Sequence, residues 1–323
     1  MIERKGVSIR DFAWVAPSNV GVVGTFYEPE NVDELTTLCR QLYEKRLPFD
    51  LVGHTSNILY TSGYAVERMV STRKVDRYHI ESNRIICECG TNVRLLAQSM
   101  VDTGVKGFEG LIDLPGTVGS AIYGNAGCFQ CSLSELLQEA TLLTPDGKIL
   151  TVGADWFHFT KRSSVLKRHE KKAIILSVTL RKEIGDADLL RQQANENHLK
   201  RRASQPGPKN SLGSVFSNSG EATVLKKQID FQLQELEAEL ISKHADTKTQ
   251  REETTRMALS LLGHESLQPY VRAWNWYQWN DDEAHRLFWC YVQQHRRMFT
   301  RSDFEIEIKG LDSDEIERLI SEY

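Results

Sequence analysis

Apolar and polar positions alternate with two different periods along the first half of the chain. After Asn31, a residue suited to a helix N-cap, residues 32–46 repeat apolar positions at helical spacing. Residues 48–60 read as a strand that runs into a polar turn. Further strands are expected at 69–80, 84–90, 139–152 and 171–183. Residues 92–104 form a helical pattern between the second and third of these strands, so this half is predicted to mix helices and strands.

The second half is dominated by charged helical patterns. One polar helix is expected from about residue 186 to the Pro206-Gly207-Pro208 stretch. A second is expected from 221 to about 243, with its apolar residues in one stripe that faces a core: Leu225, Ile229, Leu233, Leu236 and Leu240. Residues 244–256 are almost entirely polar, which fits either a mobile linker or a solvated helix end. A helix at 282–299 and an alternating strand at 304–310 close the chain.

Within the predicted strand 139–152, Pro145, Asp146 and Gly147 form a hairpin-turn signal. The changes in pattern divide the chain into three expected parts. They are residues 1–68, residues 69–185, and residues 186–323 with a charged helical insert at about 221–270.

Composition narrows the class of function. The 323 residues include 40 basic and 44 acidic residues, for a formal net charge of −4. Because these charges are well mixed, the sequence has no basic segment of the kind that binds nucleic acid or an anionic membrane. The composition is more typical of an enzyme that acts on small molecules. No apolar run reaches the length of a membrane span, and the first residues lack the apolar segment of a signal peptide. We therefore expect a cytoplasmic protein.

The six cysteines do not suggest a metal site. Only Cys128 and Cys131 have metal-like spacing, and no second pair accompanies them, because Cys87 and Cys89 lie in an alternating strand pattern. Ordinary thiols in a reducing compartment are expected, with no bound metal.

Two glycine-rich stretches carry the candidate chemistry. They are VGHTSN at residues 52–57 and GLIDLPGTVGSAIYGNAGCF at residues 110–129. Glycine allows a diphosphate to approach backbone N–H groups closely, and Ser56, Asn57 and Thr117 can add side-chain donors. Neither stretch has the pattern of a nucleotide hydrolase or of a dinucleotide-binding βαβ unit.

The run PGTVGSAIYGNAGCF resembles the flavin loop of UDP-N-acetylenolpyruvoylglucosamine reductases, and VGHTSNIL is similar to the other flavin loop of that family. The resemblance implies an α+β fold: a two-lobed FAD-binding domain, of the type found in vanillyl-alcohol oxidase, followed by an α/β substrate-binding domain. The lobes are expected at 1–68 and 69–185. The residues implied to bind FAD are Gly53, His54, Thr55, Ser56, Asn57, Ile58, Pro115, Gly116, Thr117, Gly119, Ser120, Asn125, Ala126 and Gly127.

Three further motifs match the catalytic residues of that family. KRSSVLK aligns Arg162 with the arginine that pairs with the substrate carboxylate, GSVFSN aligns Ser214 with the proton donor, and FEIEIK aligns Glu307 with its assisting carboxylate. The family also implies substrate contacts from Tyr123, Asn218 and Asn275. The implied reaction is the NADPH-dependent reduction of UDP-N-acetylglucosamine enolpyruvate to UDP-N-acetylmuramate, for peptidoglycan synthesis, by a monomer.

The chain departs from the family at several positions. Lys161 stands where the family has tyrosine, and Ser217 and Ser219 stand where it has lysine and proline. The insert after Gly220 replaces a usual family segment. Two alternatives therefore stay open: an FAD-dependent oxidoreductase of the same fold that acts on another sugar or polyol, with His54 as a point of covalent flavin attachment, and a flavin- or sugar-nucleotide-binding protein without turnover.

Overall fold

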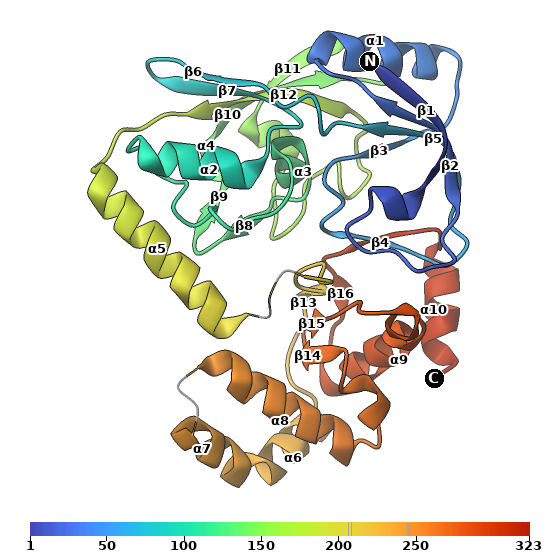
Figure 1. Cartoon of the computed structure of the whole chain (residues 1–323), viewed down its shortest axis with the longest axis vertical. Coiled ribbons are helices and arrows are strands. Elements are labelled where there is room, and N and C mark those ends of the chain that lie inside the picture. Colours follow the sequence, from blue (N-terminus) through green and yellow to red (C-terminus); the bar gives the residue numbers. More distant parts are fainter. Residues whose placement is uncertain (206, 208, 244–245) are drawn as a thin grey trace. The chain divides into compact units, whose positions relative to one another are not determined.

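The computed structural model describes residues 1–205, 207, 209–243 and 246–323 (Figure 1). The chain forms two compact units. Unit 1 comprises Met1–Ser8, Val22–Thr55 and Ala65–Leu199. Unit 2 comprises Ile9–Gly21, Ser56–Tyr64 and Lys200–Tyr323. The expected position of Pro206 and Pro208 at a helix end, and the expectation for residues 244–245, lie outside the described residues.

Unit 1 contains two sheets. The first has the order β1–β2–β5–β3, with the bounds Ile2–Ser8, Val22–Glu28, Val66–Ser71 and Asp50–Val52. In it β1 is antiparallel to β2, whereas β5 runs parallel to both β2 and β3. The second is antiparallel throughout and has the order β11–β10–β12–β7–β6, with the bounds Ile149–Gly153, Leu137–Leu143, Ile174–Arg181, Arg84–Glu88 and Tyr78–Ile80.

Helices and one small hairpin complete unit 1. They are α1 (Val32–Glu44), α2 (Val93–Asp102), α3 (Val118–Tyr123), α4 (Leu133–Leu136), the hairpin of β8 (Gly127–Cys128) and β9 (Cys131–Ser132), the 3-10 turn η2 (Ala154–Phe157), and α5 (Ala187–Ser204) up to Leu199. As the pattern predicted, the Asn31 side chain caps α1 by accepting a bond from the Glu34 N–H. The apolar faces of α1 and α2 enter one core with the second sheet, including Leu38, Leu96 and Leu176.

The predicted strands of this unit form, but two of them are interrupted. Residues 139–152 become β10 and β11 around the predicted turn, where Thr144 and Lys148 are bonded across the loop and Gly147 has a φ of +79°. Residues 69–80 are split into β5 and β6, and residues 48–60 into β3 and β4. Each interruption falls at a turn. Between β5 and β6, for example, the Val75 N–H donates to the Thr72 carbonyl within the turn and not to a neighbouring strand.

Unit 2 is organised around the long helix α9 (Asp282–Met298), capped by Asp281. Its other elements are η1 (Ile9–Asp11), the parallel pair β4 (Ile58–Tyr60) and β17 (Glu307–Lys309), the pair β13 (Phe216–Asn218) and β16 (Asp303–Phe304), η3 (Glu265–Leu267), the pair β14 (Val271–Ala273) and β15 (Trp276–Tyr277), and α10 (Ser313–Ser321). Phe288 and Tyr291 of α9 are fully buried in the core of this unit with Tyr277.

The charged insert consists of three helices, which Figure 1 shows side by side: α6 (Val224–Gln232), α7 (Gln234–Lys243) and α8 (Thr247–Leu261). The prediction of a single helix at 221–243 is therefore wrong, since the helix is interrupted at Leu233. The break lets α6 pack on α9 and α8 while α7 packs on α8. The apolar stripe does face a core, in which Ile229 and Leu233 are buried. From Asp246, which caps α8, the polar stretch is helix rather than linker.

The compact units do not follow the three parts expected from the sequence. Residues 9–21 and 56–64 fold with the C-terminal unit, and unit 1 extends to Leu199 instead of ending at 185. Because β5 spans residues 66–71, the first sheet also crosses the expected lobe boundary at 68. The division at 1–68, 69–185 and 186–323 remains a prediction about lobes. In the described part of the chain, no helix is long and apolar enough to cross a membrane.

His295 on α9 gives unit 2 a defined pH dependence. The ring is fully buried and stacked on Phe216, with the ring centroids 3.8 Å apart. Its nitrogens bond to the hydroxyls of Ser302 at 2.7 Å and Ser219 at 3.2 Å. Burial lowers the pKa of His295 to about 3 from an ordinary value of 6.5, so the folded protein holds this ring neutral.

Because the unfolded chain takes up this proton below pH 6.5 and the folded chain does not, acid should destabilise the fold. The free energy of unfolding should fall by about 1.4 kcal/mol per pH unit from this group as the pH drops below 6.5. Urea unfolding followed by tryptophan fluorescence at pH 7 and pH 5 measures the slope. His295→Gln should reduce it and the exposed control His79→Gln should not. An equal slope in all three proteins would contradict the assignment.

Candidate active site

The first glycine-rich stretch is a loop to which an arginine donates hydrogen bonds. Arg73 donates from Nε to the Gly53 carbonyl at 3.0 Å and from Nη2 to the Thr55 hydroxyl at 3.5 Å. Thr55 is buried and has a φ of +58°. Burial, assisted by the positive charge of Arg73, lowers the pKa of His54. The loop therefore combines half-buried backbone with one fixed cation and an imidazole that stays neutral at pH 7.

The second glycine-rich stretch is partly helical, whereas the sequence suggested a continuous loop. Gly116 has a φ of +122°, and the next residue, Thr117, is the N-cap of α3. The hydroxyl of Thr117 accepts from the Ser120 N–H and the Ser120 hydroxyl accepts from the Thr117 N–H, which forms a capping box. Thr117 is buried, so its hydroxyl serves the helix cap in this structure instead of pointing outward, while Ser120 is exposed.

The two glycine-rich stretches lie against each other within unit 1. A Cβ placed on Gly53 would come within 2.7 Å of the Thr117 hydroxyl oxygen. Gly119 packs on the end of β7, where its N–H donates to the Cys89 carbonyl at 2.7 Å. Glycine is therefore required at both positions by close packing. Two glycine-rich backbone segments side by side, with Arg73 behind one and the start of α3 on the other, form a cradle that fits a diphosphate group.

The second stretch ends at Asn125–Gly127, and Arg162 is bound to it. The Arg162 guanidinium donates to the Gly127 carbonyl at 2.6 Å and to the Asn125 carbonyl at 3.4 Å. Asn125 also donates from its side chain to the Thr160 carbonyl at 2.7 Å. Arg162 has a φ of +57° in a two-residue turn closed by mutual backbone bonds between Thr160 and Ser163. Unusual backbone at a non-glycine residue thus turns this side chain onto the glycine-rich stretch.

A second arginine, Arg168, supports that turn. Arg168 contacts the hydroxyls of Thr160 and Ser163, and it donates to the His158 carbonyl at 3.2 Å. Its charge is paired with Glu170 at 2.7 Å. Arg168 is therefore a structural cation that fixes both ends of the turn carrying Arg162.

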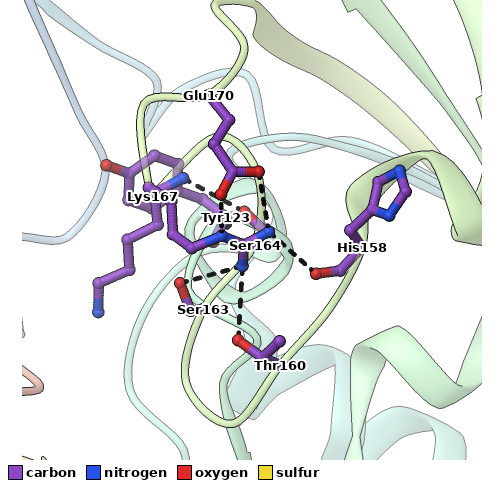
Figure 2. Close-up of polar contacts among 8 residues, drawn as sticks. Tyr123, His158, Thr160, Ser163, Ser164, Lys167 and Glu170 are labelled. Carbon is purple, nitrogen blue, oxygen red and sulfur yellow. Dashed lines mark hydrogen bonds and ion pairs between the residues drawn. The ribbon is translucent and has the colours of Figure 1, made fainter.

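The same segment is tied to α3 by a buried hydroxyl. Ser164 donates to the Tyr123 carbonyl at 2.7 Å and accepts from the Lys167 N–H at 3.4 Å (Figure 2). Tyr123, implied as a substrate contact, is half-buried at the end of α3. The KRSSVLK motif therefore both orients Arg162 and anchors the glycine-rich stretch.

In unit 2, Ser214 lies beside a tryptophan. The Trp276 indole N–H donates to the Ser214 hydroxyl at 3.4 Å, and the two residues form an isolated antiparallel bridge. Since an indole can only donate, the hydroxyl accepts from Trp276 and its own proton must point to another acceptor. Ser214 also borders a pocket of about 520 Å³. This arrangement suits a serine that gives up a proton into the pocket.

Asn275 holds the strand that follows Ser214. Its side chain accepts from the Phe216 N–H at 2.6 Å and donates to the Phe216 carbonyl at 2.8 Å. Its own carbonyl accepts from the Val215 N–H at 3.1 Å. Asn275, implied as a substrate contact, is thus engaged in holding the backbone, although it also borders the pocket. The side chain of Asn218 closes a local turn by accepting from Gly220 N–H at 2.9 Å.

Glu307 is brought near this strand by Asn57. The Glu307 N–H donates to the Asn57 carbonyl at 2.9 Å, and the Asn57 side chain donates to the Leu212 carbonyl at 3.1 Å. The Glu305 N–H also bonds to the Val215 carbonyl at 2.7 Å. Two residues of extended strand span roughly 7 Å, so Ser214 and Glu307 lie on neighbouring backbone segments. The Glu307 carboxylate is paired with Lys309 at 3.2 Å.

The implied site residues thus fall into two groups. Unit 1 brings together Gly53–Thr55, Pro115–Gly127 and Arg162. Unit 2 brings together Asn57, Ser214, Asn218, Asn275 and Glu307, along with Ser56 and Ile58. The chain passes from one group to the other between Thr55 and Ser56.

Sequence reasoning missed three side chains that shape these groups: Arg73, Arg168 and Trp276. Arg73 and Arg168 lie in polar segments, where an arginine normally faces water, so their sequence context carries no signal. Trp276 adjoins Asn275, a substrate contact implied by the family, and the two tryptophans that flank this asparagine were the available hint.

The chain is similar to known proteins that bind FAD. Residues 24–153 match a family model described as an FAD binding domain. The chain is 33% identical over 190 residues to the UDP-N-acetylenolpyruvoylglucosamine reductase of Caldicellulosiruptor saccharolyticus, an alignment that covers 58% of this chain and 61% of that protein. It is 26% identical over 200 residues to the Clostridium novyi protein of the same name, covering 62% of this chain and 63% of that protein.

The chain therefore spans about three fifths of the length of these curated relatives, 61% and 63%. Among solved structures, UDP-N-acetylenolpyruvylglucosamine reductase (MurB) from Thermus caldophilus aligns with a TM-score of 0.65 at 18% identity, covering 96% of this chain and all (100%) of that chain. The expected α+β fold with an FAD-binding domain is confirmed. The chain is therefore similar in sequence, over about three fifths of their length, to UDP-N-acetylenolpyruvoylglucosamine reductases (MurB), and it shares the fold of one of them.

Proposed function

We propose that this protein is an FAD-dependent enzyme that reduces UDP-N-acetylglucosamine enolpyruvate to UDP-N-acetylmuramate with NADPH, in peptidoglycan precursor synthesis. The observation that carries the proposal is Ser214, whose hydroxyl accepts from Trp276 on one side and borders a pocket on the other. A flavin- or nucleotide-binding protein without turnover has no need of a hydroxyl oriented to donate. We further propose a cytoplasmic monomer.

The cradle in unit 1 would hold the FAD diphosphate. Gly53–Thr55 would supply backbone donors, and Arg73, fixed on Gly53, would supply a positive charge close to them. Pro115–Gly127 would line the cradle, since the N–H groups of Thr117 and Gly119 already donate to the Ser120 hydroxyl and the Cys89 carbonyl. Bound FAD would supply the hydride that it takes from NADPH. Side chains of this protein would protonate the substrate and stabilise the enolate.

The substrate is an enol ether conjugated to a carboxylate. Hydride adds to its terminal CH₂ carbon, and the electron pair of the double bond moves onto the carbon bearing the carboxylate, as an enolate. The Ser214 hydroxyl then transfers its proton to that carbon, and the serine is reprotonated from water with assistance from Glu307. A positioned acid of this kind contributes roughly 10² to 10⁴ in rate.

Arg162 would stabilise the enolate through the substrate carboxylate. Its guanidinium carries five N–H donors, and the carbonyls of Gly127 and Asn125 hold it on the flavin cradle. A planar fork fixed in this way can offer further donors to a carboxylate, which a lysine ammonium cannot do in the same geometry.

Ser120 allows the flavin cradle to be tested without damage to the fold. Glutamate and glutamine are both favoured at the third position of a capping box, so Ser120→Glu and Ser120→Gln should each preserve α3. Only Ser120→Glu places a negative charge beside the expected diphosphate. We predict that its FAD affinity, from fluorescence titration of the apoprotein, falls at least about tenfold below that of Ser120→Gln, a change of about 1.4 kcal/mol. Equal affinities would rule out a diphosphate at this position.

Arg162 can be replaced without strain by glycine, which tolerates its φ of +57°. Arg162→Gly and Arg162→Lys should both fold, with weaker FAD binding because the bond to the Gly127 carbonyl is lost or altered. At saturating FAD, oxidation of the reduced flavin by substrate should slow by a factor of about 10² to 10³, since one electrostatic group is lost. Stopped-flow absorbance of the flavin measures this step. Full-rate oxidation in Arg162→Lys would reject the bidentate role.

Ser214→Ala should separate hydride transfer from protonation. Reduction of FAD by NADPH needs no proton on a substrate carbon, so we expect it to be unchanged. Reoxidation by the enolpyruvyl sugar nucleotide should slow about a hundredfold or more, because the enolate loses its positioned acid. Ser217→Ala, in the same motif, serves as the control. If Ser214→Ala impairs flavin reduction and spares reoxidation, the serine shapes the flavin pocket and is not the proton donor.

A further inference from the structure

The pocket that Ser214 borders is also lined by residues of the three-helix insert. Its volume is about 520 Å³, and Ser214, Asn275 and Trp276 form one wall. Leu240 of α7 and Thr254 and Arg251 of α8 are among the residues of the opposite walls. The insert is therefore part of the pocket into which the proposed proton donor faces, and residues that only this insert supplies can contact whatever the pocket binds.

Arg251 differs from the other cations around this pocket. Lys226, the other cation of the lining, is paired with Asp230. Outside the pocket, Arg256 on the same helix as Arg251 is paired with Glu253 at 3.3 Å. The guanidinium of Arg251 makes a 3.4 Å bond to the Ser204 carbonyl. Within the described residues it forms no ion pair with a carboxylate, and its side chain is exposed toward the pocket.

The charged groups of the lining favour an anion beside Arg251 over one elsewhere in the pocket. Lys226 and Asp230 compensate each other, which leaves Arg251 and Glu237 as the remaining charged groups of the lining. An anionic group would avoid Glu237 on α7 and contact Arg251 on α8. Trp274 and Trp276, half-buried in the wall, add aromatic surface on which a flat base or a sugar can stack.

The GSVFSN motif, whose Ser214 borders the pocket, lacks the lysine that the family motif has. Ser217 stands at the lysine position, and its hydroxyl donates to the Asp303 carbonyl at 3.2 Å. A sugar-nucleotide diphosphate carries two negative charges or more, and arginine matches phosphate oxygens in a bidentate fashion.

We propose that Arg251, from the insert helix α8, binds the diphosphate of the sugar nucleotide and takes the place of the missing lysine. The insert is thereby a specificity-determining part of the substrate site. This inference rests on the proposed function for the identity of its ligand, while its test uses binding alone.

The test is calorimetric titration of the oxidised holoprotein with UDP and with uridine. In Arg251→Ala, UDP affinity should fall at least tenfold relative to the unsubstituted protein, and uridine affinity should stay the same. Arg251→Lys should recover part of the loss. Arg256→Ala removes a cation from the same helix outside the pocket and should bind both ligands normally. Thermal unfolding of each variant verifies that α8 is intact.

Several outcomes would overturn the proposal. UDP affinity that is unchanged in Arg251→Ala would do so, as would equal losses for UDP and uridine, or an equal loss of UDP affinity in Arg256→Ala. Failure of the proposed function is seen separately. If UDP binding depends on Arg251 but the reduced flavin is not oxidised by the enolpyruvyl sugar nucleotide, the anion site stands and the proposed reaction is wrong.

Discussion

The organisation of unit 2 depends on the two hydrogen bonds that Asn57 makes at the end of the first glycine-rich stretch. Its carbonyl accepts from Glu307 and its side-chain amide donates to the Leu212 carbonyl. These bonds start the parallel pairing of β4 with β17 and hold the segment that leads into Ser214. A residue whose motif implied flavin binding is therefore also the structural link between the two proposed catalytic residues of this unit. A hydrophobic side chain at position 57 could not donate the hydrogen bond that the Asn57 amide makes to the Leu212 carbonyl.

Unit 1 uses backbone carbonyls in a comparable way. Arg162 and Arg73 both donate to carbonyls of the glycine-rich stretches, at Gly127 and Gly53. Charge-assisted bonds of this kind are stronger than neutral ones. They order segments that, being rich in glycine, lose more conformational entropy on folding than other residues do. The cations thus fix the cradle and at the same time leave its environment positive, as a diphosphate requires.

Local chemistry made part of this structure predictable. The Asn31 cap, the Pro145–Gly147 turn and the apolar stripe of 225–240 each depend on neighbouring residues, and each appears as expected. The break at Leu233 was missed because it comes from packing against α8 and α9, which no local pattern encodes. The helix α3 was missed because its glycines suggested a loop, whereas Gly119 is needed for contact with Cys89. The contacts of Trp276 with Ser214, and of Arg73 with Gly53, join residues distant in sequence, so only the fold reveals them.

The central claim is that the bound flavin passes its electrons to an enolpyruvyl sugar nucleotide. The most direct measurement is an anaerobic titration of the fully reduced holoprotein with UDP-N-acetylglucosamine enolpyruvate, in the absence of NADP and oxygen. The account predicts that the oxidised flavin spectrum returns in proportion to added compound, with one equivalent oxidising one flavin. A flavin that stays reduced until oxygen is admitted would contradict it.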